Sequence, residues 1–459
     1  MGDDNELAAR DRGLSSLGLL MQLGGTVFAA ATIVYMFLSL IGIHGDAGDM
    51  LVMFFILGLC GVRSMFHRQA GTDLLYGRRV FGVTDAPQDY LAGVRRYVGV
   101  AFAHTAVVGL LLWGKYDAPA GVVLGVSAGL ALWPTILAIM LSLPTFKQFK
   151  TEMPATEDKG FEGASILMAT LGGIGVCSST VALLVMFKAG GYLMQGPGVL
   201  LMLALIMLAI RSFIHLQAGI AGLRETSVER SVDLANRYAN FGVITSFCAG
   251  GALLLLSMAT SLNVLVLALV CALVWVLMAW PLIIRRFFSD RQFADLVAGE
   301  AAPMHRRARD AGLSGLGWLL VTSSVLGISL VLPSFIAGRP FATVAYEKLL
   351  GIAGISFEHS MWWSVGFAVL QAWAGIELIK MSTMHRTVGS LYAIAGAIMQ
   401  IYLLWPMLDM FWHGGSDSIS MAVIVGSLAR VLALPIATLI LVNRRLAPTA
   451  LARFRTRKP

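Results

Sequence analysis

Long apolar runs separated by short polar segments dominate the pattern of this chain. The runs Leu17–Ile41, Ala164–Phe187 and Val264–Trp280 illustrate it. About 20 apolar residues are needed for an α-helix to cross the hydrocarbon core of a bilayer. The pattern therefore predicts an all-α polytopic membrane protein with about twelve transmembrane helices. The predicted spans are 14–42, 50–75, 92–113, 120–143, 162–187, 198–223, 236–259, 263–284, 313–336, 361–380, 388–411 and 419–442.

A short motif that opens a span occurs three times. Arg10–Leu14, Glu157–Phe161 and Arg309–Leu313 each combine charged residues with a glycine and lead into an apolar run. The copies are separated by roughly 150 residues, a period far above that of solenoid proteins. We therefore predict three membrane repeats of four helices each. The predicted organisation is a cytoplasmic N-terminus at 1–13, membrane repeats at 14–150, 151–300 and 301–446, and a basic cytoplasmic tail at 447–459.

Positions in the later helices of each predicted repeat also correspond. The string Arg-Ser-x-x-His-x-Gln-Ala-Gly begins at Arg63 and again at Arg211. The third repeat keeps the Ala-Gly pair but has lost the basic part, with Phe367 and Gln371 at the equivalent positions. The third helix begins near a tyrosine and the fourth contains a proline: Tyr97, Tyr238 and Tyr392, then Pro134 or Pro144, Pro281 and Pro435.

Basic residues are divided unequally between the two sets of predicted loops. Loops rich in Lys and Arg face the cytoplasm, so both termini are predicted to be cytoplasmic, in a bacterial inner membrane. Because each repeat has an even number of spans, the repeats should be parallel to one another. The net charge of +8 follows from this asymmetry and does not indicate nucleic-acid binding. The basic set holds Arg78, Arg79, Arg95, Arg96, Lys147, Lys150, Arg224, Arg230, Arg285, Arg286, Arg306, Arg307, Arg444 and Arg445; the opposite set holds Lys115, Lys188, Arg339 and Lys348.

The composition argues against a soluble enzyme. Hydrophobic residues make up 57% of the chain and charged residues 13%, which lies outside the usual range of soluble domains. The sequence contains no P-loop, HExxH or CxxC motif, so we expect no catalytic activity, no cofactor and no metal.

Twelve spans with threefold internal similarity resemble the haem–copper oxidase core in architecture alone, because the histidines do not stand in that family's pattern.

The sharpest candidate site consists of Arg63 with His67 and Arg211 with His215. The i, i+4 spacing places each pair on one helix face, and ionisable groups inside spans are by default functional hypotheses. Three interpretations remain open: an anchor at the inner headgroups, a binding site for an anion or lipid headgroup between repeats, and haem ligation by the two histidines. His104, in the third span, is interpreted as a hydrogen-bonded core histidine or as part of a proton relay.

Arg430 is the other anomaly, since it lies near the middle of the last predicted span. A central arginine costs at least about 2.5 kcal/mol on insertion scales, so it should have a partner or reach water. Glu377, in the tenth span, is the obvious carboxylate for it. We therefore predict an intramembrane pair of Glu377 and Arg430, with a pore-lining Arg430 as the alternative.

Two functions fit these patterns. The first is an integral membrane transport or channel-like protein for a small anionic or lipidic ligand, with Arg63 and Arg211 in its site. The second is a non-catalytic membrane subunit or scaffold of a larger envelope complex. The expected partners are membrane lipids and, for the second function, other membrane proteins. A hydrated cavity reaching the two arginines would favour the first function, and a tightly packed interior would favour the second.

Overall fold

The fold consists of long α-helices. The computed structural model describes residues 13–42, 47–76, 91–143, 146, 161–188, 197–223, 228–260, 264–288, 309–337, 357–380, 382–414 and 418–443. The helices in this part are α2 (Leu14–Gly42), α3 (Ala47–Tyr76), α4 (Ala92–Gly114), α5 (Ala120–Ser142), α7 (Phe161–Lys188), α8 (Pro197–Leu223), α9 (Val228–Thr260), α10 (Val264–Phe288), α12 (Arg309–Ala337), α14 (Phe357–Lys380), α15 (His385–Gly414) and α16 (Ser418–Asn443).

These helices coincide closely with the predicted spans, and the prediction of an all-helical polytopic membrane protein is confirmed. Among the described residues, ten helices contain an apolar stretch long enough to cross a bilayer, and α16 adds a shorter one, Leu432–Asn443. The largest difference is in α9, which begins at Val228, whereas the predicted span starts at residue 236. The additional turns carry polar residues such as Asp233, so hydropathy alone does not detect them.

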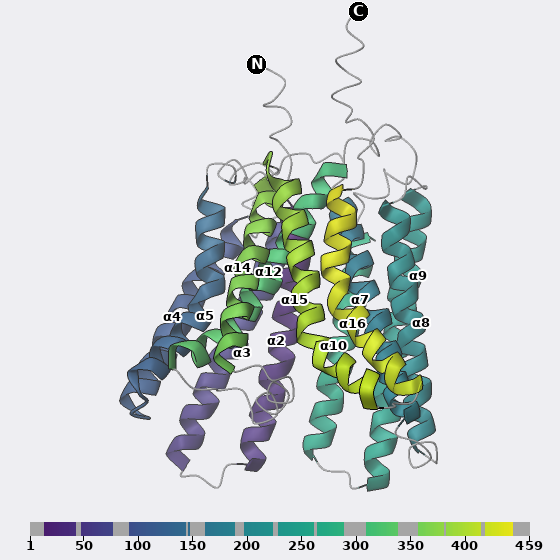
Figure 1. The fold of residues 1–459 in the computed structure, drawn as a ribbon. Coiled ribbons are helices and arrows are strands. Elements are labelled where there is room, and N and C mark those ends of the chain that lie inside the picture. Colours follow the sequence, from purple (N-terminus) through teal and green to yellow (C-terminus); the bar gives the residue numbers. More distant parts are fainter. Residues whose placement is uncertain are drawn as a thin grey trace, which may run out of the picture.

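The first helix of each predicted repeat lies in the middle of the bundle. Helices α2, α7 and α12 contact one another there, and each also packs along the next helix of the chain. Contacts between the predicted repeats follow a closed order, because α5 packs on α12, α16 packs on α7, and α10 packs on α2 (Figure 1). The last helix of one predicted repeat thus always covers the first helix of another. The three contacts form a ring around the centre, not an open row.

Three small residues mark the point where the central helices meet. Ser16, Gly163 and Gly315 are equivalent positions of the predicted repeats, each lying three residues after the glycine of the opening motif. A Cβ atom added at Gly315 would lie 3.1 Å from the Cα atom of Gly163, and one added at either glycine would overlap the hydroxyl oxygen of Ser16. Small residues let helix backbones approach closely where lipid gives helices no hydrophobic reason to associate.

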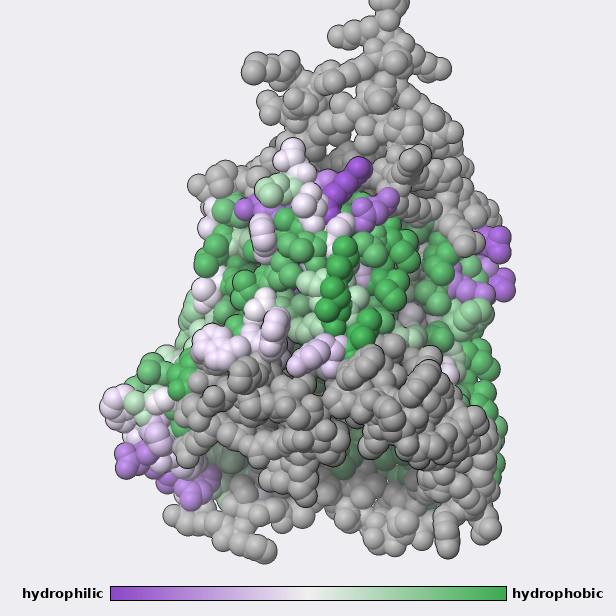
Figure 2. All heavy atoms as spheres, in the orientation of Figure 1, coloured by the Kyte–Doolittle hydropathy of each residue, from purple (hydrophilic) through white to green (hydrophobic). Residues whose placement is uncertain are grey.

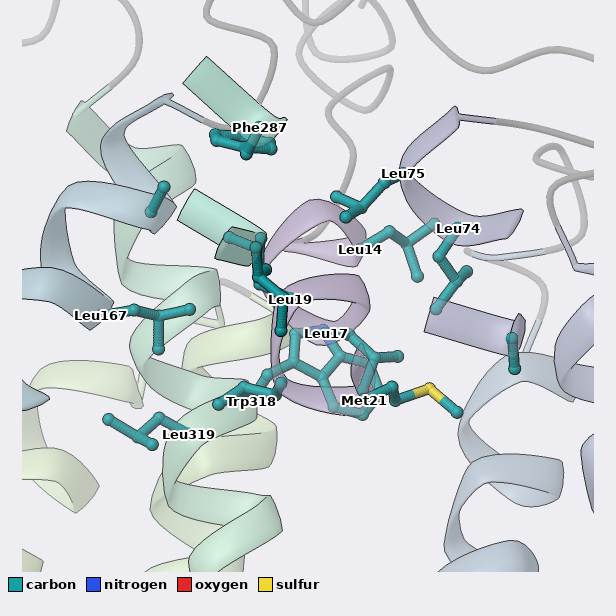
Figure 3. Packing of buried hydrophobic residues seen from close by; sticks show 14 of the residues in the cluster. Leu14, Leu17, Leu19, Met21, Leu74, Leu75, Leu167, Phe287, Trp318 and Leu319 are labelled. Atoms are coloured by element: carbon teal, nitrogen blue, oxygen red, sulfur yellow. The ribbon is translucent and has the colours of Figure 1, made fainter. Parts of the chain in front are cut away.

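The buried side chains concentrate at the end of the bundle where α2 begins and α16 ends (Figure 1). Leu17 and Met21 of α2 pack there with Leu75 of α3 and with Trp318 of α12, which is fully buried (Figure 3). On the outside, apolar side chains spread across the middle of the visible face and hydrophilic ones gather along its upper edge (Figure 2). An apolar belt around a packed interior is the surface that a bilayer requires.

Candidate functional site

Arg211 lies in the interior of the second predicted repeat. It stands near the middle of α8, and the residue is 8% exposed. Its Nη2 donates a hydrogen bond to the backbone carbonyl of Leu277 in α10 at 2.7 Å, and its Nη1 donates to Ser246 Oγ in α9 at 3.2 Å. The guanidinium carbon also lies 5.8 Å from the centre of the Tyr238 ring. One side chain from α8 therefore joins the three outer helices of its repeat.

The carbonyl that Arg211 contacts is free because of a proline. Pro281 lies inside α10, four residues after Leu277. Proline has no backbone N–H, so the carbonyl four residues earlier loses its helical partner. In a membrane, a freed backbone carbonyl needs a partner from within the protein. Arg211 supplies that partner from a neighbouring helix.

Arg63 makes the same contact in the first predicted repeat. Its Nη2 donates to the carbonyl of Leu130 at 2.7 Å, and Pro134 follows Leu130 by four residues inside α5. This contact identifies Pro134, and not Pro144, as the equivalent of Pro281. The second nitrogen, Nη1, lies 3.2 Å from His104 Nδ1, and His104 Nε2 lies 3.3 Å from Cys60 Sγ. Since arginine can only donate, His104 accepts through Nδ1 and carries its proton on Nε2.

The two histidines are held by tryptophans that precede the prolines. Trp280 Nε1 donates to His215 Nε2 at 2.8 Å, and His215 stacks on Tyr238 with ring centres 4.2 Å apart and planes inclined by 11°. Trp133 Nε1 donates to His67 Nε2 at 3.0 Å. In both neutral imidazoles the indole contact places the ring proton on Nδ1. The structure thus brings each arginine and histidine together within its own repeat, with separate partners for each pair.

The third predicted repeat replaces this polar arrangement. Phe367, at the arginine position, stacks on Tyr392 with ring centres 5.3 Å apart. Gln371, at the histidine position, donates through Nε2 to Ser323 Oγ in α12 at 2.6 Å. A Cβ atom added at Gly396 would lie 2.8 Å from the Phe367 ring and 3.4 Å from Pro435, so this interior is filled by aromatic packing.

The charges of Arg63 and Arg211 are not neutralised by a described carboxylate. The ion pairs within the described residues are Lys115–Asp49 and Arg237–Asp233, with N–O distances of 3.1 and 2.9 Å. Both arginines instead contact neutral acceptors, namely carbonyl, hydroxyl and imidazole groups. Arg211 is buried and Arg63 is partly buried, and guanidinium groups with neutral partners are suited to attract an anion. Within the described residues, no cluster of three or more His, Cys, Asp or Glu side chains could hold a metal ion.

The predicted pair of Glu377 and Arg430 is not tested by the structure. The Glu377 carboxylate accepts a hydrogen bond from the Ser382 hydroxyl near the end of α14. The backbone of Arg430 belongs to α16, but its side chain lies outside the described part of the chain. The pair stays a prediction.

A double substitution tests that pair. Glu377→Gln or Arg430→Gln alone should lower the melting temperature of the purified protein, because each leaves one charge uncompensated in the membrane interior. Glu377→Gln with Arg430→Gln should recover most of the loss, since the double variant leaves neither charge behind. Thermal melts in detergent measure all four proteins. Additive losses would contradict the pairing.

Sequence reasoning missed several residues of this arrangement. Trp133 and Trp280 could have been found, because the dipeptide Trp-Pro recurs in the fourth helix of the first two repeats. Asp73 was also missed, although it stands two residues after the Ala-Gly pair, where the third repeat has Glu377. It is 3% exposed and accepts a hydrogen bond from Gln69 Nε2 at 2.7 Å.

One string in α5 matches an enzymatic motif by letters alone. Gly125, Ser127 and Gly129 spell GxSxG. In hydrolases that motif forms a sharp turn between a strand and a helix, which exposes the serine. Here it lies within the continuous helix α5, so the match does not describe a nucleophile elbow.

The comparisons with known proteins found no relative of this chain. No protein-family model matches the chain, and neither a curated protein nor a solved structure is detectably similar to it.

Proposed function

We propose that this protein is a multi-pass membrane transport or channel-like protein for a small anionic or lipidic ligand. The observation that carries the proposal is Arg211, a buried guanidinium in the middle of α8 with neutral partners. Arg63 supports it with the same contact to a carbonyl freed by proline. Placing a charge in a membrane interior is costly, and such residues commonly mark substrate or ion pathways. Two fixed cations without described counter-charges favour a negatively charged ligand.

The proposal includes an arrangement and an orientation. Three parallel four-helix repeats would surround a pseudo-threefold axis, which the cyclic helix contacts and the meeting of Ser16, Gly163 and Gly315 support. Both ends of the chain would face the cytoplasm of a bacterial inner membrane, as the distribution of basic residues indicates. In this proposal the protein is not an enzyme and does not bind nucleic acid. Membrane lipids are its expected partners.

Ion flux from proteoliposomes tests the proposal. Purified full-length protein should release chloride or nitrate from vesicles faster than empty vesicles do. Arg211→Gln and Arg63→Gln should each reduce the rate by about tenfold or more, since a lost charge–anion contact worth about 1.4 kcal/mol already gives that factor. The same vesicles, labelled with fluorescent anionic lipid, report lipid movement between leaflets. This second measurement distinguishes a small-anion ligand from a lipidic one.

Arg68→Gln is the matched control for these variants. Arg68 belongs to α3 as Arg63 does, but it is exposed. Its substitution should leave the rates unchanged. If the wild type moves neither anions nor lipids, or if the Arg63 and Arg211 variants move them at the wild-type rate, the transport proposal is wrong.

A non-catalytic subunit or scaffold is the second candidate. The close packing of α2, α7 and α12 at Ser16, Gly163 and Gly315 favours it, because a closely packed centre offers no path along the axis at that level. Purification from native membrane with mild detergent, followed by mass spectrometry, tests this candidate. A stoichiometric protein partner together with absent flux would support the scaffold.

A further inference from the structure

Each predicted repeat carries an exposed arginine at the end of the bundle where α2 begins. Arg96 lies near the start of α4, Arg285 in the last turn of α10, and Arg386 in the first turn of α15. All three side chains are exposed, and within the described residues none of them forms an ion pair. We call these three residues the basic collar.

The two ends of the bundle differ in the charge of their described surface. At the end with the basic collar, the exposed carboxylate is that of Asp233, which forms an ion pair with Arg237 at 2.9 Å. At the opposite end, Lys115 pairs with Asp49 at 3.1 Å, and Asp117 adds an exposed carboxylate. Hydrophilic side chains gather along the upper edge of the face seen in Figure 2. Within the described residues, the positive potential that attracts anionic partners is therefore confined to one end.

The basic collar lies on the membrane helices themselves. Arg96 and Arg285 belong to the apolar stretches Ala92–Gly114 and Leu269–Phe288, which are long enough to cross a bilayer. Arg386 is the second residue of α15. Long basic side chains near the ends of membrane helices extend their charged groups toward the headgroups. The guanidinium groups are therefore within reach of lipid phosphates, whereas a soluble acidic protein would first meet the loops.

We propose that the basic collar binds anionic phospholipids through contacts between guanidinium and phosphate groups. Arginine donates paired hydrogen bonds that match the geometry of a phosphate. Each basic side chain close to a bilayer surface also adds attraction for lipids with net negative charge, which zwitterionic headgroups lack. The inference goes beyond the proposed function, because it holds for a transport protein and for a scaffold subunit alike.

Energy transfer from tryptophan to pyrene-labelled lipid tests this assignment, with the purified full-length protein in phosphatidylcholine nanodiscs. The wild type should prefer labelled phosphatidylglycerol over labelled phosphatidylcholine. Arg96→Gln, Arg285→Gln and Arg386→Gln combined should lower that preference about fivefold, since one basic side chain near a headgroup contributes about that factor. Lys115→Gln is the control at the opposite end of the bundle and should keep the wild-type preference.

A salt series on the wild type keeps the test independent of the triple variant. High concentrations of sodium chloride should reduce the preference for phosphatidylglycerol, because salt screens exposed charges. The assignment is wrong if the wild type shows no preference, if salt leaves the preference unchanged, or if the triple variant keeps it. An acidic protein that copurifies with the wild type but not with the triple variant, in the absence of a lipid preference, would show that the basic collar binds a protein instead.

Discussion

Replacing Gly163 with leucine is expected to destabilise the protein by about 3 kcal/mol or more, at the upper end of overpacking effects. A Cβ atom at this position would overlap the Ser16 hydroxyl oxygen, and Gly315 lies directly beside it. The clash sits where three helices meet, so no single helix can move aside without disturbing the other two. The expected result is a large fall in the melting temperature in detergent, or a shift to aggregate on size-exclusion chromatography.

Two glycines on the same helices provide the controls. Gly173 on α7 and Gly327 on α12 would each receive a Cβ atom with nothing within 4 Å. Gly173→Leu and Gly327→Leu should therefore melt close to the wild type, even though they add the same side chain. If Gly163→Leu melts like Gly173→Leu, the central helices do not meet as described.

The second large effect is a coupling between Arg211 and Pro281. Arg211→Met leaves the Leu277 carbonyl without its 2.7 Å partner, and a buried unsatisfied carbonyl costs about 1–3 kcal/mol. Pro281→Ala restores a backbone N–H that can bond the same carbonyl within α10. Arg211→Met should therefore lower the free energy of unfolding by about 1–3 kcal/mol more when residue 281 is proline than when it is alanine. Unfolding free energies of the four proteins measure this coupling.

The first predicted repeat provides both a replicate and a control for this measurement. Arg63→Met with Pro134→Ala should show coupling of the same sign, because Arg63 bonds the Leu130 carbonyl that Pro134 leaves free. The crossed pair, Arg211→Met with Pro134→Ala, has no shared carbonyl and should be additive. Equal coupling in the matched and crossed pairs would show that the prolines destabilise their helices in general and that the shared carbonyl is not the cause of the coupling.

Much of the fold was readable from the sequence, because a membrane helix satisfies its own backbone and must be apolar along its length. The span predicted at 14–42 coincides with α2, and the others agree closely, apart from the polar first turns of α9. The pairing of Arg63 with His67 on one face followed from the i, i+4 spacing alone. The partners of these residues did not follow, since they come from helices about 40 to 70 residues away.

The sequence by itself determined the helical membrane class, the spans and the internal similarity, since each depends on local hydropathy or on recurring strings. Only the tertiary structure decided that the central helices meet at Ser16, Gly163 and Gly315, and that the contacts of α5 with α12, α16 with α7 and α10 with α2 close a ring. It also gave Arg211 the role of satisfying a carbonyl freed by proline, and joined each histidine to the tryptophan before that proline. The physical reason is that hydropathy is a property of each segment, whereas close packing and hydrogen bonding depend on which segments become neighbours.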